Sequence, residues 1–556
     1  MPAPARPPSR PSRSAMRRSV AAGLALLAWL AGCAPAPSPA RRAVDGRPAY
    51  GGRFVFPVRS EPPTLSFIAG DQIAVLIDRL VGDSLVDRDA AMKPVPRLAS
   101  SWEFSPDGRR LTFHLRPGVR FHDGAPCTSA DVAYTYERVI DPKSRALARI
   151  DGFLPVERLE TPDPLTVRVT YRSPFAPALE AWTVPILPRH LFANEPDFAS
   201  SPRHRAPVGS GPFRFASWDP GRRIVLVANA DYWGGRPYLD SIVFQIIPSS
   251  ETTLQALLAG ELDYAPLAPL QWEAHAGGAA FAARFRTVRF VQLFFYYIAW
   301  RGDGSNPFFA DPAVRRAMTL ALDREGYVRS VLRGLGEVTP SLVPFDPAPP
   351  GALRPGPLPY DPGAAASLLD GAGWRLDART GLRTKAGIPF RFTLLIFSGG
   401  EDHVKFAQVA QESLRRIGVE MAIERLDWPT LFSRLAKGDF QATLSGFLHG
   451  TDPDDAYTFL HSSQIAGGRN YAAFRDPSID RWLEAGRSTL DPEERGRLYR
   501  DVDRRLRDLQ PYTVLFSPAV QAALVLQAHN VVPTPRGILD HYPGAAAIYL
   551  EGGGKP

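Results

Sequence analysis

Residues 93–142 decide the fold of this chain. They read KPVPRLASSWEFSPDGRRLTFHLRPGVRFHDG (93–124) followed by APCTSADVAYTYERVIDP (125–142). Pro106-Asp107-Gly108 has the composition of a tight turn, because proline fixes φ and glycine accepts a positive φ. Leu111, Phe113 and Leu115 alternate with polar residues, and this period of two predicts a half-buried strand.

The rest of this stretch predicts a second hairpin and then a helix. Pro117-Gly118 and Asp123-Gly124 are turn sequences, with a short strand expected at Val119–Phe121 between them. Thr128 stands three residues before Asp131, which is the spacing of a capping box, and we expect a helix from there to Asp141-Pro142.

The order of these motifs resembles the family 5 extracellular solute-binding proteins of ABC importers, the peptide- and nickel-binding group. A second block that resembles the family covers Trp218–Gly221 and Asn229–Asp240. The motifs of the first block that carry the resemblance are Trp102, Ser105–Gly108, Leu115–Val119, Phe121–Gly124 and Ala130–Val132. The resemblance implies an α/β fold of the periplasmic binding protein type II kind, with two lobes, a hinge, a cleft and an extra subdomain in the N-terminal lobe.

The predicted organisation divides the chain into seven segments. Val291–Trp300 is an almost unbroken apolar and aromatic run, and we expect a fully buried strand there, at the crossing between the lobes. The expected segments are a lipoprotein signal peptide (1–32), a lipid-anchored flexible tether (33–50), lobe 1 part a (51–92), the extra subdomain of lobe 1 (93–206), lobe 1 part b (207–295), lobe 2 (296–511) and a C-terminal return to lobe 1 (512–556).

The N-terminus has the composition of an export signal. Five arginines and no acidic residue precede the apolar run Val20–Leu30, which is too short to span a bilayer. Leu30-Ala31-Gly32-Cys33 resembles a bacterial lipobox, which implies cleavage before Cys33 and lipid modification of its thiol. The alternatives are an ordinary secretory signal with a chance cysteine, and a twin-arginine signal at Arg17-Arg18.

The composition indicates a soluble, globular body. The chain is 45% hydrophobic and 22% charged, enough to bury a large core. The formal charge of +8 includes the five arginines of the leader, so the remaining surplus does not indicate a nucleic-acid partner. Only Cys127 follows Cys33, so no disulfide is expected within the folded part.

The sequence predicts a binding protein rather than an enzyme. It contains no Walker-type phosphate loop, no His-Glu-x-x-His and no Gly-x-Ser-x-Gly. The resemblance implies the extracytoplasmic, periplasmic component of an ABC transporter, which captures a peptide or peptide-like solute and delivers it to permease subunits. We expect a monomer, anchored to the membrane by lipid, without a cofactor. The alternatives are a secreted hydrolase of small peptides or esters and a transporter-independent receptor or chaperone on the same fold.

Two residues of the first strand-to-loop segment are candidate ligand contacts. Glu61 and Thr64 lie in Ser60–Leu65, which matches the family segment that lines the cleft and can pair with an extended ligand backbone. The alternative is a proline-rich surface turn.

The remaining candidate contacts surround the sequence GFLHGTDPDD at residues 446–455. In peptide-binding relatives, a loop after a Gly-Trp pair carries an aspartate that holds the amine of the peptide. Here Phe447 stands in the place of the tryptophan, and no acid occupies the usual position. Asp452 or Asp454 could substitute, or both could be turn and cap residues. A buried ammonium without a carboxylate costs roughly several kcal/mol, so we expect a ligand other than an ordinary peptide with a free amino terminus.

His449 and Arg469 complete the predicted site. His449 and His461 could suggest nickel, but two histidines twelve residues apart without a cysteine make a weak pattern, and no metal is expected. Arg469 lies in Gly468–Tyr471, which matches a family segment near the cleft. Its guanidinium could bind a ligand carboxylate in a bidentate manner, and the alternative is a solvated side chain.

Overall fold

The computed structural model of the protein describes residues 48–69, 71–146, 150–339, 341–343, 356–399 and 401–553. Cys33, the predicted signal peptide and most of the predicted tether lie outside these residues. In the part of the chain that is described, no helix combines the length and the apolar character needed to cross a membrane.

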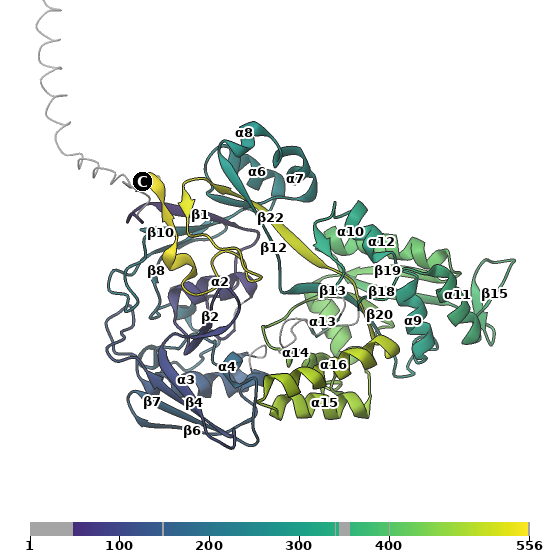
Figure 1. Ribbon diagram of the computed structural model, residues 1–556, viewed down its shortest axis with the longest axis horizontal. Helices are drawn as coiled ribbons and strands as arrows, with labels where there is room; N and C mark the ends of the chain where they lie inside the picture. Colours follow the sequence, from purple (N-terminus) through teal and green to yellow (C-terminus); the bar gives the residue numbers. More distant parts are fainter. Residues whose placement is uncertain are drawn as a thin grey trace, which may run out of the picture. The chain divides into compact units, whose positions relative to one another are not determined.

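Two four-stranded sheets form what we call the first lobe (Figure 1). One has the order β1 (Arg53–Val58), β10 (Ser241–Ile246), β9 (Arg223–Ala228) and β8 (Phe213–Asp219), with β1 parallel to β10. The other has the order β4 (Ala99–Phe104), β5 (Arg110–Leu115), β7 (Thr166–Tyr171) and β6 (Val156–Asp163). Side chains from both sheets share one hydrophobic core.

The stretch that decides the fold forms most of its predicted elements. Gly108 takes a φ of 66° at the turn between β4 and β5. Leu111, Phe113 and Leu115 of β5 are buried as predicted, but Thr112 is buried as well, so the strand is more buried than its alternation suggests. Helix α3 (Ser129–Ile140) begins after Thr128, whose backbone N–H donates to Asp131 Oδ2 at 2.8 Å. Val119–Phe121, however, is not a strand. Its only ladder contact is a single bridge from Arg120 to Pro126, because the two turns leave too little extended chain for pairing.

A buried ion network connects the two family blocks of the first lobe. Arg97 donates to Asp83 at 2.6 Å and to Asp87 at 2.5 Å. Trp233 Nε1 and Tyr232 Oη, from the second block, also donate to Asp83, at 2.7 and 3.1 Å. Burial raises the pKa of the Asp83 carboxyl, and these donors oppose that effect. Asp83 follows α2 (Gln72–Val81), after which the chain turns into β2 (Val86–Arg88) to form this network.

A five-stranded sheet is the centre of what we call the second lobe. Its order is β19 (Glu420–Leu426), β18 (Arg391–Phe397), β20 (Ala442–Leu448), β13 (Phe294–Trp300) and β21 (Tyr512–Val514). β18 is parallel to β19 and β20, as the alternation of strands and helices predicts, whereas β13 is antiparallel to β20 and β21. Residues of β13 enter a different core from each face, and all of them except Phe294 and Tyr296 are buried. The predicted strand over Val291–Trp300 is therefore shorter than expected, since Val291 ends β12, and it is buried along most of its length.

Helices cover both faces of this sheet. The helices of the second lobe are α9 (Pro312–Leu320), α10 (Arg324–Ser330), α11 (Pro362–Gly371), α12 (Glu401–Arg415), α13 (Trp428–Lys437), α14 (Asp455–Leu460), α15 (Pro477–Ser488) and α16 (Pro492–Leu509). The remaining short elements are β3 (Pro94–Pro96), α4 (Ala178–Ala181), α5 (Arg189–Phe192), α6 (Ser250–Leu258), α7 (Pro269–His275), α8 (Ala279–Ala282), β14 (Gly336–Glu337), β15 (Arg375–Leu376), β16 (Arg383–Lys385), β17 (Ile388–Pro389), β23 (Ala528–His529) and β24 (Tyr549–Leu550).

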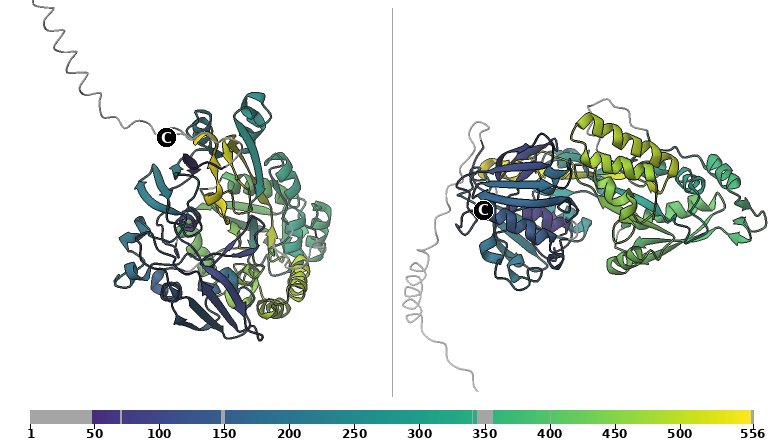
Figure 2. Two further views of the ribbon diagram at one scale, coloured as in Figure 1. Left: turned by 60° about the vertical axis from the view of Figure 1, so that its left-hand side comes forward. Right: turned by 90° about the horizontal axis from the view of Figure 1, so that it is seen from below.

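Two neighbouring strands carry the chain between the lobes. β12 (Phe285–Val291) leads into β13, and β22 (Ser517–Val525) follows β21; the two pair antiparallel along their length, beside β11 (Tyr264–Pro266). Figure 2 shows the yellow C-terminal segment passing from the green elements to the purple and blue ones. The predicted return to the first lobe (512–556) does not begin with β21, which pairs with β13 in the second-lobe sheet; β22 leads the chain back.

Candidate functional site

An exposed aromatic stack lies beside the carboxyl ends of the parallel strands. Phe397 ends β18, and its ring stacks on Trp428 with centroids 4.3 Å apart. Trp428, the first residue of α13 after β19, stacks in turn on Phe432 at 5.0 Å. Trp428 is 37% exposed and Phe432 is 50% exposed. Large aromatic rings stacked in contact with solvent are typical of a surface that a ligand or partner covers.

The position of this stack agrees with the general rule for open α/β sheets. Ligands bind outside the carboxyl ends of parallel strands, where loops rather than helices meet the sheet edge. Leu448, the last residue of β20, is also exposed at that edge. These aromatic residues were not predicted as site residues, because the sequence around a tryptophan at a helix start does not indicate whether its ring is exposed.

The two aspartates predicted as ligand contacts are held by arginines. Asp452 accepts two hydrogen bonds from Arg495, at 2.6 and 2.8 Å. Asp454 accepts from Arg487 Nε at 2.9 and 3.0 Å and from Tyr499 Oη at 3.2 Å. Burial raises the pKa of Asp454, and Arg487 opposes that effect. Both carboxylates thus fix the loop before α14 to α15 and α16. Asp452 also accepts from the Asp454 backbone N–H at 2.9 Å, as a turn residue would, whereas the Asp454 side chain makes no capping hydrogen bond at the start of α14.

Phe447 and His449 lie at the end of β20, under the same loop. The Phe447 ring packs edge-on against Phe459 at 4.2 Å, and Arg469, which is exposed, lies over Phe447 at 5.9 Å. His449 is buried, and its Nδ1 lies 2.9 Å from the Gly450 carbonyl oxygen. Burial lowers the pKa of His449 to about 4, so the imidazole is neutral at neutral pH. The Phe295 ring contacts both Phe447 and His449, with centroids 6.0 and 5.7 Å apart, and so joins them in one cluster with Arg469 as its exposed member.

Glu61 and Thr64 lie in the loop after β1. Glu61 accepts hydrogen bonds from Trp218 Nε1 at 2.6 Å and from the Gly221 backbone N–H at 3.1 Å, and so it fixes the turn between β8 and β9. Arg205 covers the Trp218 ring at 3.6 Å. Thr64 is half-buried. These contacts place the two residues in the first lobe, apart from the Phe447 cluster of the second.

A group of residues that sequence analysis missed joins the two lobes. Glu180, in α4 of the first lobe, accepts a hydrogen bond from Thr451 Oγ1 of the second lobe at 2.8 Å. Arg88 donates to the same carboxylate, and Arg536 lies 3.8 Å from it. Burial raises the pKa of Glu180, but Arg88 and then Arg536 outweigh burial and bring it to about 2. We call Glu180, Arg88, Arg536 and Thr451 the interlobe clasp.

Asp455 lies next to the clasp, and the pKa of its carboxyl is unusually high. It accepts a hydrogen bond from the Gly450 backbone N–H. Burial, together with the charges of Glu180, Asp452 and Asp454, raises the pKa of Asp455 to about 7. In this arrangement of the lobes, Asp455 therefore keeps its proton to a higher pH than an ordinary aspartate does.

Backbone contacts extend the interface between the lobes. The Ala176 N–H donates to the Arg487 carbonyl oxygen at 2.7 Å, and the Arg487 guanidinium lies over the Phe175 ring at 5.6 Å. Leu490 packs over Gly108, where any Cβ would come within 2.5 Å of its methyl group. The loop between α15 and α16 thus rests on the extra subdomain. Across the described residues, no three His, Cys, Asp or Glu side chains gather as a metal site would require.

Comparison with known proteins defines the class. Residues 93–470 match the family model described as bacterial extracellular solute-binding proteins, family 5 middle. The match covers more than half of the chain, and the chain therefore belongs to this family. The interpretation as the solute-binding component of an ABC importer is confirmed, and the hydrolase alternative is not supported.

Individual relatives match nearly the whole chain. The oligopeptide-binding protein AppA of Bacillus subtilis is 30% identical over 489 residues, which cover 85% of this chain and 87% of AppA. Protein XP55 of Streptomyces lividans is 32% identical over 512 residues, 91% of this chain and 90% of XP55. The solved structure of Bacillus subtilis AppA in complex with a nonapeptide matches with a TM-score of 0.77 at 27% identity, covering 91% of this chain and 100% of AppA. The predicted type II binding-protein fold is confirmed.

The buried ion pair between Asp452 and Arg495 gives a test of its structural role. Asp452→Asn should lower the free energy of unfolding by about 3–5 kcal/mol, because it leaves a buried guanidinium without its partner. Glu420→Gln, in the exposed Arg391–Glu420 pair, is the control and should cost less than about 1 kcal/mol. Urea unfolding measures both. Wild-type stability in Asp452→Asn would contradict the assignment.

Proposed function

We propose that this protein captures a peptide or peptide-like molecule between its two lobes, performs no chemistry on it, and delivers it to an ABC permease. The observation that carries the proposal is the exposed stack of Phe397, Trp428 and Phe432 at the carboxyl ends of the parallel strands. The nonapeptide complex of AppA supports a ligand of the peptide class. Apolar side chains would pack on the rings while the lobes enclose the backbone.

We also propose that the ligand does not depend on a free amino terminus. Asp452 and Asp454 are both neutralised by arginines, so neither offers a free carboxylate to an ammonium group. Glu61 and Thr64 from the first lobe, and Phe447, His449 and Arg469 from the second, are proposed ligand contacts. Of these, Arg469 would bind a ligand carboxylate, because it is exposed beside Phe447.

The aromatic stack can be tested with a defined pair of peptides. An N-acetylated nonapeptide and its free-amine counterpart should bind the wild type with affinities that differ by less than about tenfold. Trp428→Ala should weaken both by about tenfold or more, because it removes the central ring of the stack. Leu376→Ala, an exposed apolar residue of β15 in the same lobe, is the control and should bind as the wild type does. Calorimetric titration gives the affinities. Equal affinities of Trp428→Ala and the wild type would show that the aromatic stack is not part of the binding site.

Closure of the lobes should depend on pH through Asp455. This arrangement of the lobes favours the protonated carboxyl, because burial raises the pKa of Asp455 and the charge of Glu180 across the interface raises it further, while Arg88 and Arg536 are already engaged by Glu180. Peptide affinity should therefore fall as the pH rises through about 7, by at most about tenfold per pH unit, because one proton is involved.

Asp455→Asn should remove this pH dependence, whereas Glu420→Gln should keep it. Titrations of the acetylated nonapeptide from pH 5.5 to 8.5 measure the effect. An affinity that is the same function of pH in the wild type and in Asp455→Asn would show that Asp455 does not titrate on closure.

We propose that the mature chain begins at Cys33, is lipid-modified there, and is held by a tether (33–50) on the outer side of a bacterial membrane as a monomer. The support is the lipobox-like Leu30–Cys33 sequence after a basic, apolar leader. Cys33→Ala, expressed in the bacterial host, should appear in the soluble extracytoplasmic fraction rather than with membranes. Partition of this variant with membranes, as for the wild type, would contradict the anchor.

A further inference from the structure

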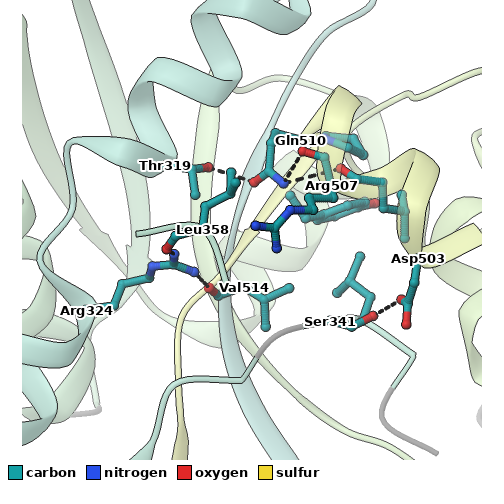
Figure 3. A pocket seen from close by; sticks show the side chains of 12 residues that line it. Thr319, Arg324, Ser341, Leu358, Asp503, Arg507, Gln510 and Val514 are labelled. Atoms are coloured by element: carbon teal, nitrogen blue, oxygen red, sulfur yellow. Dashed lines mark hydrogen bonds between the residues drawn. The ribbon is translucent and has the colours of Figure 1, made fainter. Parts of the chain in front are cut away.

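A pocket in the second lobe is lined by two arginines, and none of its lining residues belongs to the interlobe clasp. It lies between α9, the start of α10, α16 and β21 (Figure 3). Its volume is about 40 Å³, which is room for about three water molecules or one oxyanion of similar size. Its polar walls include Thr319, Arg324, Ser341, Asp503, Arg507 and Gln510.

Arg324 is a buried cation with no acidic partner among the residues that the structure describes. Its guanidinium donates to the Val514 carbonyl oxygen at 2.8 Å and to the Leu358 carbonyl oxygen. Of its five N–H groups, these contacts use two. Burial lowers the pKa of Arg324 to about 10, so the side chain is still charged at neutral pH. A buried charge that is satisfied only by carbonyls is costly unless an anion compensates it.

Arg507 adds a second positive charge to the same pocket. It lies in the last turn of α16, and its guanidinium donates to the Gly356 carbonyl oxygen. Its charge also contributes to the lowered pKa of Arg324, whereas the exposed Glu325 acts in the opposite direction. Figure 3 shows the two guanidinium groups entering the pocket from two sides.

The other polar side chains that line the pocket already make hydrogen bonds within the protein. Thr319 Oγ1 donates to Gln510 Oε1 at 2.9 Å, and Gln510 Nε2 donates to the Arg507 carbonyl oxygen at 3.0 Å. Asp503 accepts a hydrogen bond from Ser341. The donors that remain toward the pocket therefore belong to the two guanidinium groups, whose planar forks match the oxygens of a carboxylate or phosphate.

We propose that this pocket binds a small oxyanion, a carboxylate or phosphate group, between Arg324 and Arg507. The site is separate from the aromatic stack and does not depend on the proposed peptide ligand. The bound anion would connect α10, α16 and the segment Gly356–Leu358, and so it would stabilise the second lobe by binding only the folded chain.

Thermal unfolding of the full chain without peptide tests the proposal. Sodium phosphate and sodium acetate are titrated separately, with sodium chloride at matched ionic strength as the reference. We expect a saturable rise of the melting temperature above the chloride curve in at least one of the two. A response to phosphate alone identifies a phosphate group as the ligand, and a response to acetate identifies a carboxylate.

Two variants separate the site from general salt effects. Arg507→Gln should raise the half-saturating concentration by about tenfold or more, the loss expected for a charge-assisted hydrogen bond. Arg497→Gln, an exposed arginine on the same helix, is the matched control and should respond as the wild type does. Calorimetric titration of the folded protein at 25 °C gives the same comparison without unfolding.

Stabilisation that rises without saturation in phosphate, or that is the same in Arg507→Gln and the wild type, would overturn the proposal, because excluded salts act on any folded protein in that way. The result does not depend on peptide binding. A negative result in the peptide experiments would therefore not contradict the anion site. A negative result in the anion titrations would not contradict the proposed function.

Discussion

The hydrogen bond from Thr451 to Glu180 connects two lobes that the chain joins through the paired strands β12 and β22. Glu180 remains ionised because Arg88 and Arg536, both from the first lobe, surround it. The first lobe therefore supplies a charged acceptor, the Glu180 carboxylate, and the second lobe supplies the donor, the Thr451 hydroxyl group. A hydrogen bond to a charged acceptor contributes about 1.5–3 kcal/mol. Together with the contacts that Ala176 and Gly108 make with Arg487 and Leu490, it sets the balance between joined and separated lobes. Binding that contacts both lobes would shift this balance toward the closed arrangement.

The acidic loop before α14 combines rigidity with a titrating group. Arg495 and Arg487 neutralise Asp452 and Asp454 and fix the loop to two helices of its own lobe. Asp455, the next residue, has no such arginine in its hydrogen bonds and faces Glu180 instead. Three neighbouring carboxyls therefore have two different roles: two hold the loop in place, and one responds to the approach of the other lobe.

Local sequence signals predicted most of the elements, because these depend on neighbours in the chain. The turn at Gly108, the start of α3 after Thr128 and the burial of β13 all follow from spacing and composition. The strand at Val119–Phe121 and the start of the 512–556 return were predicted less well, since strand pairing depends on residues that the local sequence does not specify. The family resemblance supplied the lobes and the transport role. It did not supply the clasp, because Arg88, Glu180 and Thr451 are separated by 92 and 271 residues and meet only in the folded protein.

The central claim is that the two lobes close on a solute, and small-angle X-ray scattering measures it most directly. The radius of gyration of the protein, freed of co-purified ligand by unfolding and refolding, should fall when a saturating nonapeptide is added. Glu180→Gln, which weakens the acceptor of the clasp, should show a smaller fall at the same occupancy. An unchanged radius of gyration in the wild type, with calorimetry confirming that peptide is bound, would contradict the account.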